Sequence, residues 1–568
     1  MAKYLRIAIF VGCFLYGGSA FAGTYYIAAN GSDSNNGTSK TSPWLHAPGM
    51  PNCTGSCAAH TPAPGDQFIF RGGDTWHFGN SGASPYVGAP VACIGASETC
   101  SWLISWSGTN GNSIYWGVDQ TWFSGAAWTR PIMNGDNPTS TSGVASCTYD
   151  ESVDQLIAIH GLSGEAIFNT IDNFEFIGLC WSGPQQVPPG AASHINLAEF
   201  DNTIANHGNL VENIYIHGWT HKTFSCSSGP VGNCDGAFGI AGPSDTSLGH
   251  GDMLHNNVID GSDTDTVSLI GTGWACSDVA YSVYRYLANG VVCNNNHTFH
   301  DNLTEYLTHS GDGQSHANGV EFNTEQHGTS NVFYNNVYRH FQLGGIGCGN
   351  VVVWRTPQTT DYAFNNLIYD QSSACNNANY WDLVTSNQGG ADGWTDNEFN
   401  NTWILSSNGP FANSTMNGTS TVNMYNTHCI TPNGGSSGAA CQTITGKINY
   451  LTNVVQATSA ATGQGYTAAE LYAYSATAST NATVGAGTNQ QGFCTTLLGS
   501  GDTALVAAGT ACQSDTGYAC VYNATNHSVS CPGRTRVARP AGTAWNVGAY
   551  QLPGLVVQPA TSLQGTSH

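Results

Sequence analysis

Positive charge is scarce in this sequence. Its 568 residues include 13 lysines and arginines against 36 aspartates and glutamates, which gives a formal net charge of −23. Binding to nucleic acid or to an anionic membrane surface needs clustered lysine and arginine. A polyanionic ligand would also be repelled unless a divalent cation bridged it. The composition therefore argues against nucleic acid and anionic membranes as partners.

Long hydrophobic runs are absent after the first 22 residues. Lys3 and Arg6 precede an apolar run over residues 7–16, and the small residues Ala20 and Ala22 flank Phe21 as in a cleavage site. The run is too short to span a bilayer. Residues 1–22 are therefore predicted to be a secretory signal peptide. The mature chain is expected to be secreted to the extracellular space or the periplasm, without membrane insertion.

Several patterns of common enzyme classes are missing. Long amphipathic helical patterns are nearly absent, which disfavours a helical fold. The sequence has no Gly-x-Ser-x-Gly elbow on a strand–helix turn, no phosphate loop and no dinucleotide fingerprint. A serine hydrolase, a nucleotide-binding enzyme and a Rossmann dehydrogenase are therefore unsupported.

Cysteine is abundant, with 19 residues, of which Cys13 lies in the predicted signal peptide. An even number remains in an exported chain, so disulfides are expected, although their connectivity stays open. Zinc is the alternative for Cys53 and Cys57, but no matching pair follows at finger spacing. Close pairs suggest local staples at Cys53/Cys57, Cys93/Cys100, Cys226/Cys234 and Cys512/Cys520.

A repeat organises the chain. Eight segments share apolar or aromatic residues around a polar pair, and their third positions lie 25 to 45 residues apart, as expected for one supersecondary unit per repeat. Alternation with period 2 indicates short strands, in which Ile214 and Ile216 would face inward and Tyr215 and His217 outward. The segments are IDNFEFIG (171–178), VENIYIHG (211–218), LHNNVIDG (254–261), FHDNLTEY (299–306), FYNNVYRH (333–340), AFNNLIYD (363–370), EFNNTWIL (398–405) and NMYNTHCI (423–430).

Asparagine recurs at the fourth position of the last six segments. An inward asparagine at each corner of a coil can hydrogen-bond the backbone of neighbouring turns. The sequence therefore predicts a stacked column of Asn257, Asn302, Asn336, Asn366, Asn401 and Asn426.

These features resemble a secreted right-handed parallel β-helix protein of the pectate-lyase-like superfamily. The segment GTYYIAANGSDSNNGTSKTSPW (23–44) resembles the opening strand and turn of such proteins, and RPAGTAWNVGAYQ (539–551) resembles their closing segment. Asn546 and Gln551 replace the aspartate and glutamate that are usual there. The resemblance implies an all-β fold, a single solenoid with loop insertions and an N-terminal cap. It does not imply one activity, because this architecture hosts lyases, hydrolases, epimerases, adhesins and tailspikes.

The same resemblance divides one elongated domain into parts. Residues 23–150 are expected to form the N-terminal cap and first coils with a cysteine-rich insertion, and residues 151–430 the regular coils. Residues 431–551 would form the final coils and the C-terminal closure, followed by a disordered tail over 552–568. A solenoid contacts only its neighbours, so its length does not force a split.

The longest steps between third positions, of 43 and 45 residues, lie between residues 213 and 301. Loops there would overhang an outer face, where solenoids commonly bind substrates. His250 and Asp252 lie in a Gly-His-Gly-Asp stretch that resembles one motif of polygalacturonase-like hydrolases, although the other marks of that family are missing. A corner loop with Asx turns is the alternative interpretation. The nearby Asp260, Asp263 and Asp265 make a weak calcium site conceivable.

A second candidate lies at residues 300–327, which hold four histidines and five carboxylates. If Val320 and Phe322 face the core, Glu321 points outward by alternation. Glu321 would then act as general acid or base with Asp312 or Asp252 as its partner, since glycoside cleavage needs two carboxylates about 5–10 Å apart. A nearby imidazole would relay a proton, a role open to His316. The alternative is an ordinary solvated outer face.

A lyase would need a base such as lysine or arginine, and usually calcium. Lys222 is the best candidate base, and a plain surface lysine is the alternative. Tyr215, His217 and Trp219 are candidates for binding sugar rings, and core packing is the alternative for these side chains.

The sequence therefore predicts a secreted protein, expected to be monomeric, that acts on extracellular polysaccharide. Cleavage would be of the glycoside hydrolase or the polysaccharide lyase type, with calcium as a conceivable cofactor. The competing hypothesis is a non-catalytic surface or adhesive protein that uses the same solenoid as a stiff carbohydrate-binding rod.

Overall fold

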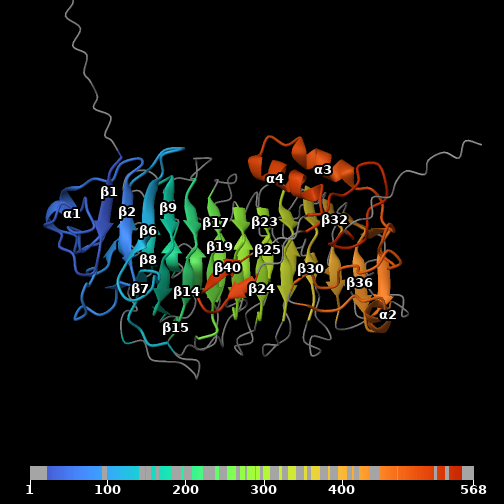
Figure 1. Ribbon diagram of the computed structural model, residues 1–568, viewed down its shortest axis with the longest axis horizontal. Coiled ribbons are helices and arrows are strands. Elements are labelled where there is room, and N and C mark those ends of the chain that lie inside the picture. The colour runs from blue at the N-terminus through green and yellow to red at the C-terminus, as the bar shows by residue number, and fades with distance from the viewer. Residues whose placement is uncertain are drawn as a thin grey trace, which may run out of the picture.

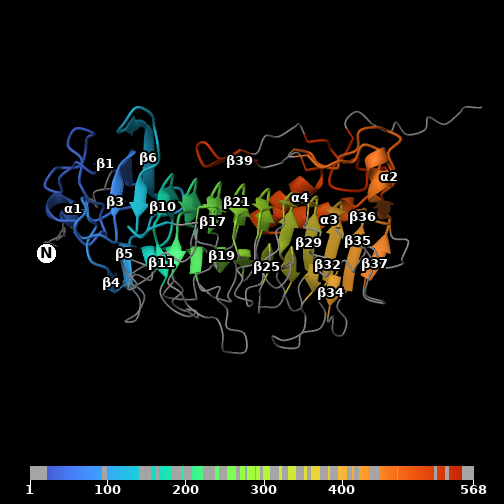
Figure 2. The ribbon, with the colours of Figure 1, turned by 90° about the horizontal axis from the view of Figure 1, so that it is seen from below.

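Three long sheets wind around one axis in the computed structural model of the chain (Figures 1 and 2). Each coil contributes one strand to sheet A, one to sheet B and one to sheet C in turn, and the strands of successive coils pair in parallel. Parallel strands joined by crossovers of this kind wind with a right hand. The structure describes residues 22–92, 99–139, 148, 155–160, 166–181, 193–196, 208–221, 237–241, 252–263, 269–274, 278–287, 289–293, 298–307, 319–322, 330–340, 351–354, 360–370, 381–383, 395–405, 412–414, 421–434, 448–469, 471–516, 521–530 and 536–552.

The predicted fold is confirmed: the chain is a right-handed parallel β-helix. Sheet A has 13 strands in the described residues, sheet B has 12 and sheet C has 11. The one antiparallel pair within the described strands of these sheets joins β4 (Val91–Ala92) to β5 (Thr99–Ile104) at the start of sheet C.

The strands of sheet A are β1 (Thr24–Ile27), β2 (Gln67–Gly72), β6 (Ile114–Phe123), β9 (Asn169–Asp172), β13 (Leu210–Glu212), β17 (Met253–His255), β20 (Asp278–Ala280), β23 (Thr298–His300), β26 (Val332–Tyr334), β29 (Thr360–Phe364), β32 (Thr395–Phe399), β35 (Thr421–Tyr425) and β37 (Ile448–Leu451). Those of sheet B are β3 (Thr75–His77), β7 (Ile132–Asn134), β10 (Glu175–Ile177), β14 (Tyr215–His217), β18 (Val258–Asp260), β21 (Val283–Arg285), β24 (Leu303–Glu305), β27 (Val337–Arg339), β30 (Leu367–Ile368), β33 (Thr402–Ile404), β36 (His428–Thr431) and β38 (Val454–Ala457).

Sheet C consists of β4 (Val91–Ala92), β5 (Thr99–Ile104), β8 (Gln155–Ile159), β12 (Ser193–Asn196), β16 (Ala237–Ala241), β19 (Leu269–Trp274), β22 (Asn289–Cys293), β25 (Val320–Phe322), β28 (Val352–Trp354), β31 (Trp381–Leu383) and β34 (Ala412–Ser414). Two small sheets add β11 (Cys180–Trp181) with β15 (Thr220–His221) and β39 (Val521–Asn523) with β40 (Ser528–Ser530). The helices are α1 (Gly55–Ala59), α2 (Thr458–Gly463), α3 (Gln491–Leu498) and α4 (Thr503–Cys512). None of these helices in the described residues is long and apolar enough to cross a membrane.

One left-handed residue turns the chain from sheet A into sheet B in each regular coil. The third positions of the first seven repeats adopt this conformation, with φ of 57° at Asn256, 54° at Asp301 and 58° at Asn335. Asparagine and aspartate tolerate it better than most residues. We call these the corner residues: Asn173, Asn213, Asn256, Tyr281, Asp301, Asn335, Asn365, Asn400, Asn426 and Thr452.

The predicted asparagine column follows each corner residue. The main-chain N–H of Asn302 donates to Asn336 Oδ1 at 3.0 Å, and that of Asn336 donates to Asn366 Oδ1 at 3.0 Å. Each side-chain amide also donates to a carbonyl of the preceding coil, such as Asn336 Nδ2 to the carbonyl of Phe299 at 2.9 Å. The column therefore satisfies main-chain groups that no sheet reaches.

Two parts of the predicted repeat were wrong. A coil between residues 256 and 301 was missed, because Tyr281 is its corner residue and Ser282 takes the asparagine place, donating its N–H to Asn302 Oδ1 at 2.9 Å. The apparent 45-residue step is therefore two coils. In the last predicted segment Asn426 is the corner residue, with φ 51°, so Thr427 and not Asn426 stands in the column.

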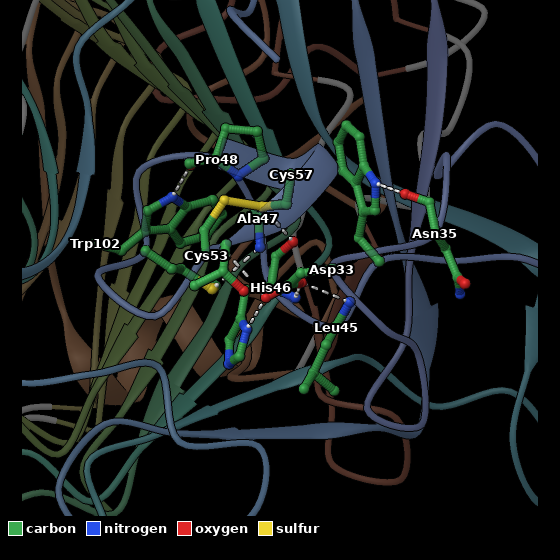
Figure 3. Close-up of a disulfide and its surroundings, with 12 residues drawn as sticks. Asp33, Asn35, Leu45, His46, Ala47, Pro48, Cys53, Cys57 and Trp102 are labelled. Atoms are coloured by element: carbon green, nitrogen blue, oxygen red, sulfur yellow. Dashed lines mark hydrogen bonds and ion pairs between the residues drawn. A yellow bond between two sulfur atoms is a disulfide. The ribbon is translucent and has the colours of Figure 1, made fainter. Parts of the chain in front are cut away.

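The inside of the solenoid is filled with large apolar side chains, and Trp76, Trp102, Trp116 and Trp403 are fully buried there. At the N-terminal end, Asp33 Oδ1 accepts the main-chain N–H groups of Leu45 at 3.0 Å and of His46 at 2.9 Å beside the Cys53–Cys57 disulfide (Figure 3). These donors make Asp33 a structural residue of the cap.

The chain beyond β38 runs back along the outside of the solenoid (Figure 2). Helices α3 and α4 lie on sheet A, where Cys494 pairs with Cys512. The staple predicted between Cys512 and Cys520 was therefore wrong, whereas that between Cys53 and Cys57 is confirmed. The β39–β40 hairpin lies across sheet B, where Arg130 donates to the carbonyl of Asn526 at 2.9 Å.

Candidate functional site

A row of titratable side chains follows the outer face of sheet A. It consists of the residues that directly precede the corner residues, so each lies one rung from the next in the parallel register. Because alternate residues of a strand point to opposite faces, these side chains point away from the core, whose sheet A positions are filled by Ile171, Val211 and Leu254. In chain order the row is Asp172, Glu212, His255, Ala280, His300, Tyr334, Phe364, Phe399, Tyr425 and Leu451.

Asp172 is held by three donors. Tyr115 Oη donates to its Oδ2 at 2.6 Å, and the amides of Asn173 and Asn213 donate to its Oδ1 at 2.7 and 2.8 Å. The next carboxyl in the row, Glu212, is partly buried and has no hydrogen-bond partner among the residues that the structure describes. Burial and the charge of Asp172 raise the pKa of Glu212, against an opposing contribution from His255. Glu212 is thus a carboxyl group that retains its proton to higher pH than usual.

Two histidines converge on Asp278, which lies on the neighbouring row of the same face. His255 Nε2 lies 2.9 Å from Asp278 Oδ2, and His300 Nε2 lies 3.1 Å from Asp278 Oδ1. Thr298 Oγ1 donates to the same carboxylate at 2.6 Å. Burial would raise the pKa of Asp278, but the two imidazoles outweigh it and hold that pKa far below its usual range.

His300 is the charged member of this group. Burial favours its neutral form, but hydrogen bonds to Asp278 and Asp301 raise the pKa of His300 to about 9. Its ring also stacks on Tyr334 with a centroid distance of 4.6 Å. His255 is bonded to one carboxylate and is 23% exposed at its side chain, so it is the histidine that can exchange protons with a ligand.

The row changes character at Tyr334. From Tyr334 to Tyr425 its side chains are aromatic and pack against α3 and α4, with Tyr334 2% and Phe364 0% exposed. Arg536 lies at the junction, 3.8 Å from Asp301 Oδ1. The titratable half of the row, from Asp172 to His300, precedes these aromatic side chains, and Glu212 and His255 are partly exposed within it; we call it the sheet A site.

Sheet B carries the predicted sugar-binding residues, and there the structure differs from the prediction. Tyr215 and His217 do point away from the core, but the β39–β40 hairpin covers them: His527 stacks on Tyr215 at 4.1 Å, and the two exposed fractions are 4% and 8%. Trp219 is 1% exposed within the core cluster, which agrees with the alternative of core packing for this side chain.

His217 has a structural environment. Its Nδ1 lies 2.7 Å from Asp263 Oδ2 and its Nε2 lies 3.1 Å from Glu175 Oε1. Burial opposes ionisation, but these two carboxylates raise the pKa of His217 to about 9. The charged imidazole thus links three coils beneath the hairpin.

Asp252 directly precedes β17 and is buried. Its Oδ1 accepts the N–H of Asn209 at 2.8 Å, just as Asn209 Oδ1 accepts the N–H of Asn169 at 2.9 Å. At 3% exposure this position does not support the predicted general acid or base role. Glu321 lies in β25 of sheet C, whereas Asp252 directly precedes β17 of sheet A. Their predicted pairing stays a prediction.

The other predicted site residues cannot be placed in the same way. Those that lie outside the described residues are Lys222, His250, Asp265, Asp312 and His316, and the side chain of Glu321 is likewise not described. Their predicted roles stay predictions.

The predicted calcium ligands are engaged where the structure describes them. Asp260 Oδ2 lies 3.5 Å from Arg285 Nη1, and Asp263 bonds His217. The described residues contain no cluster of three or more histidine, cysteine, aspartate or glutamate side chains that could hold a metal ion.

Glu212, His255 and Asp278 were not predicted as a set, although the sequence carries a signal for the first two. Glu212 and His255 stand at the same position of the repeat, directly before the polar corner pair. Comparing this one position down the repeats shows carboxylates and histidines in the early coils and aromatics in the later ones. Asp278 belongs to the coil that the repeat analysis missed.

Comparisons with known proteins find similarity of structure only at low identity. No family model matches the chain, and no curated protein matches it. A lacto-N-biosidase of glycoside hydrolase family 136 from Eubacterium ramulus is 10% identical, with a TM-score of 0.41 over 77% of this chain and 68% of that chain. A pectate lyase is 14% identical, with a TM-score of 0.36 over 93% of this chain and 96% of that chain. A rhamnogalacturonan lyase is 14% identical, with a TM-score of 0.34 over 76% and 87% of the two chains.

Proposed function

We propose that the protein cleaves glycosidic bonds of an extracellular polysaccharide at the sheet A site. The observation that carries this proposal is the arrangement of Glu212 next to His255, with His255 bonded to Asp278. A carboxyl group that retains its proton to higher pH than usual can act as general acid, and an imidazole held by a carboxylate can act as general base.

In this proposal Glu212 donates its proton to the leaving glycosidic oxygen as the bond to the anomeric carbon breaks. His255 takes a proton from the attacking water, whose hydroxyl group completes the new hemiacetal. Asp278 accepts the hydrogen bond from His255 Nε2 and stabilises the imidazolium that forms, which leaves Nδ1 as the basic nitrogen. His300 carries a positive charge, which keeps Asp278 ionised.

Hydrolysis fits this site better than β-elimination from a uronate. Elimination needs a cationic group to neutralise the uronate carboxylate. Two arginines lie beside the titratable half of the row among the described residues, and both are engaged: Arg130 is buried and donates to the carbonyl of Asn213, and Arg536 pairs with Asp301. A non-catalytic carbohydrate-binding rod is the competing function, and it predicts no bond cleavage.

The test is a panel of neutral, acidic and amino-sugar polysaccharides incubated with the purified chain. Reducing ends and the absorbance of unsaturated uronates are measured with and without a chelator. Reducing ends without new absorbance, unaffected by the chelator, are the expected result. New absorbance that the chelator abolishes would instead establish a lyase, and neither signal on any polymer would favour the rod.

A further inference from the structure

The sheet A site is a line and not a patch. Asp172, Glu212, His255 and His300 occupy one position of the coil along successive rungs, and Ala280 fills the rung between the last two. Strands in a sheet lie about 4.8 Å apart, so the line from Asp172 to His300 runs for about 19 Å along the solenoid axis. An elongated ligand that contacts these groups together must lie along that axis.

Helices α3 and α4 pack on sheet A at the C-terminal end of the line. Helix α4 contacts β23 and β26, directly at and beyond the rung of His300. Phe493 of α3 stacks on Phe399 with a centroid distance of 5.2 Å, and Leu497 and Ala508 pack into the same apolar cluster. Figure 1 shows both helices standing on sheet A over β23 to β32, while the earlier strands carry no helix on that face. We call α3 and α4 together the end wall.

The end wall is fixed in place. The disulfide between Cys494 and Cys512 joins the two helices, and both cysteines are fully buried. The aromatic side chains beneath them, Tyr334 and Phe364, would be exposed to water if the helices lifted, which is unfavourable for large apolar groups. A polysaccharide therefore cannot continue along the line past His300.

We propose that the end wall makes the enzyme act at chain ends: the terminus of a glycan stops against α4, and cleavage at Glu212 and His255 releases a short oligosaccharide of fixed size. This inference rests on the proposed function and adds the mode of attack. His255 lies three rungs from Tyr334, about 14 Å at the usual strand spacing, which leaves room for only a few sugar rings between the cleaved bond and the wall.

The test uses the full chain and the polymer that the panel selects. Viscosity and reducing ends are followed together, and the products are sized by chromatography. A chain-end enzyme releases reducing ends while viscosity stays nearly constant, and one short product dominates from the first time point. An early fall in viscosity with a ladder of products would show cleavage inside the chain and overturn the end wall proposal, while the proposed function would stand. Absence of any cleavage would overturn both.

A pair of cysteine variants separates the end wall from general stability. The double variant C494S/C512S loosens the junction of α3 and α4, so the share of longer products should rise several-fold. The matched control C53S/C57S removes the disulfide of the N-terminal cap, far from the sheet A site, and should keep the single short product. An unchanged product pattern in C494S/C512S, with hydrogen exchange confirming that the helices have loosened, would count against the wall.

Discussion

His255 Nε2 lies 2.9 Å from Asp278 Oδ2, although 23 residues separate them in the chain. One turn of the solenoid brings the two side chains together, because His255 ends β17 and Asp278 begins β20 in the next coil. This contact orients an imidazole beside Glu212 on the open half of sheet A. The proposed chemistry depends on it.

Replacing Glu212 by glutamine should lower kcat by about 100-fold or more, which is the usual contribution of a positioned general acid. The fold should persist, because no described residue hydrogen-bonds the Glu212 carboxyl. The matched control is E175Q, which alters an outward glutamate of sheet B that bonds His217. Reducing-end assays on both variants check the prediction, and equal activity in E212Q and the wild type would remove Glu212 from the mechanism.

Replacing Asp172 by asparagine should shift the pH dependence of activity. Burial and the negative charge of Asp172 raise the pKa of Glu212, so neutralising Asp172 lowers that pKa. The protonated form of Glu212 is then lost at lower pH, and the alkaline limb of the kcat profile should move in that direction. The control D119N changes a carboxylate on β6 that is paired with Lys40, and it should leave the profile in place. A limb that stays where it was in D172N would show that another group sets it.

Replacing Asn336 by alanine should destabilise the solenoid by about 1–3 kcal/mol for each buried group left unpaired. The N–H of Asn302 and the carbonyl of Phe299 both lose their partner. Chemical unfolding measures the change, and N449A, at an exposed asparagine, should stay within about 0.5 kcal/mol of the wild type. Equal stability of N336A and N449A would show that the asparagine column does not stabilise the solenoid.

Replacing Glu398 by glutamine should remove a pH dependence of stability. Glu398 is buried inside the coil with Asp396, and burial together with that carboxylate raises the pKa of Glu398 well above its usual value. The unfolded chain releases this proton near pH 4.5 and the folded chain releases it only at higher pH, so the stability of the wild type falls as pH rises above 4.5. The free energy of unfolding of E398Q relative to the wild type should therefore increase from pH 4.5 upward; a flat difference would contradict the shared burial of the pair.

Replacing His217 by glutamine tests a histidine whose charged form is stabilised by two carboxylates beneath the hairpin. The folded pKa of about 9 exceeds the ordinary 6.5, so the stabilisation is complete below pH 6.5 and is lost as pH rises through 9. The difference in unfolding free energy between the wild type and H217Q should shrink over that range. His428 gives the reverse case, because burial lowers its pKa to about 4: the unfolding free energy of the wild type relative to H428Q should increase as pH rises from 4 to 6.5.

The repeat made the architecture predictable. When an apolar alternation around a polar pair recurs at near-constant spacing, it indicates a coil. The corner residues of that coil are left-handed and its asparagines stack. Where the pattern weakened, the prediction failed: Tyr281 and Ser282 replace the asparagine pair, so that coil was missed. Asp278, the carboxylate on which His255 and His300 converge, lies in that coil and was therefore missed as well.

The site was less predictable because exposure is decided by parts of the chain that are distant in sequence. Tyr215 alternates outward as predicted, yet His527, more than three hundred residues later, stacks on its ring. The same position of the repeat is partly exposed at Glu212 and buried at Phe364. The difference is that α3 and α4 pack over Phe364.

The sequence by itself determined the winding of this protein, because strand alternation and corner asparagines act within a coil and between adjacent coils. Only the tertiary structure decided which outer face remains open, because the C-terminal segment folds back over the solenoid and buries chosen rungs of sheets A and B. Local periodicity fixes where a side chain points, whereas its contact with solvent or substrate depends on what packs against it from elsewhere in the chain.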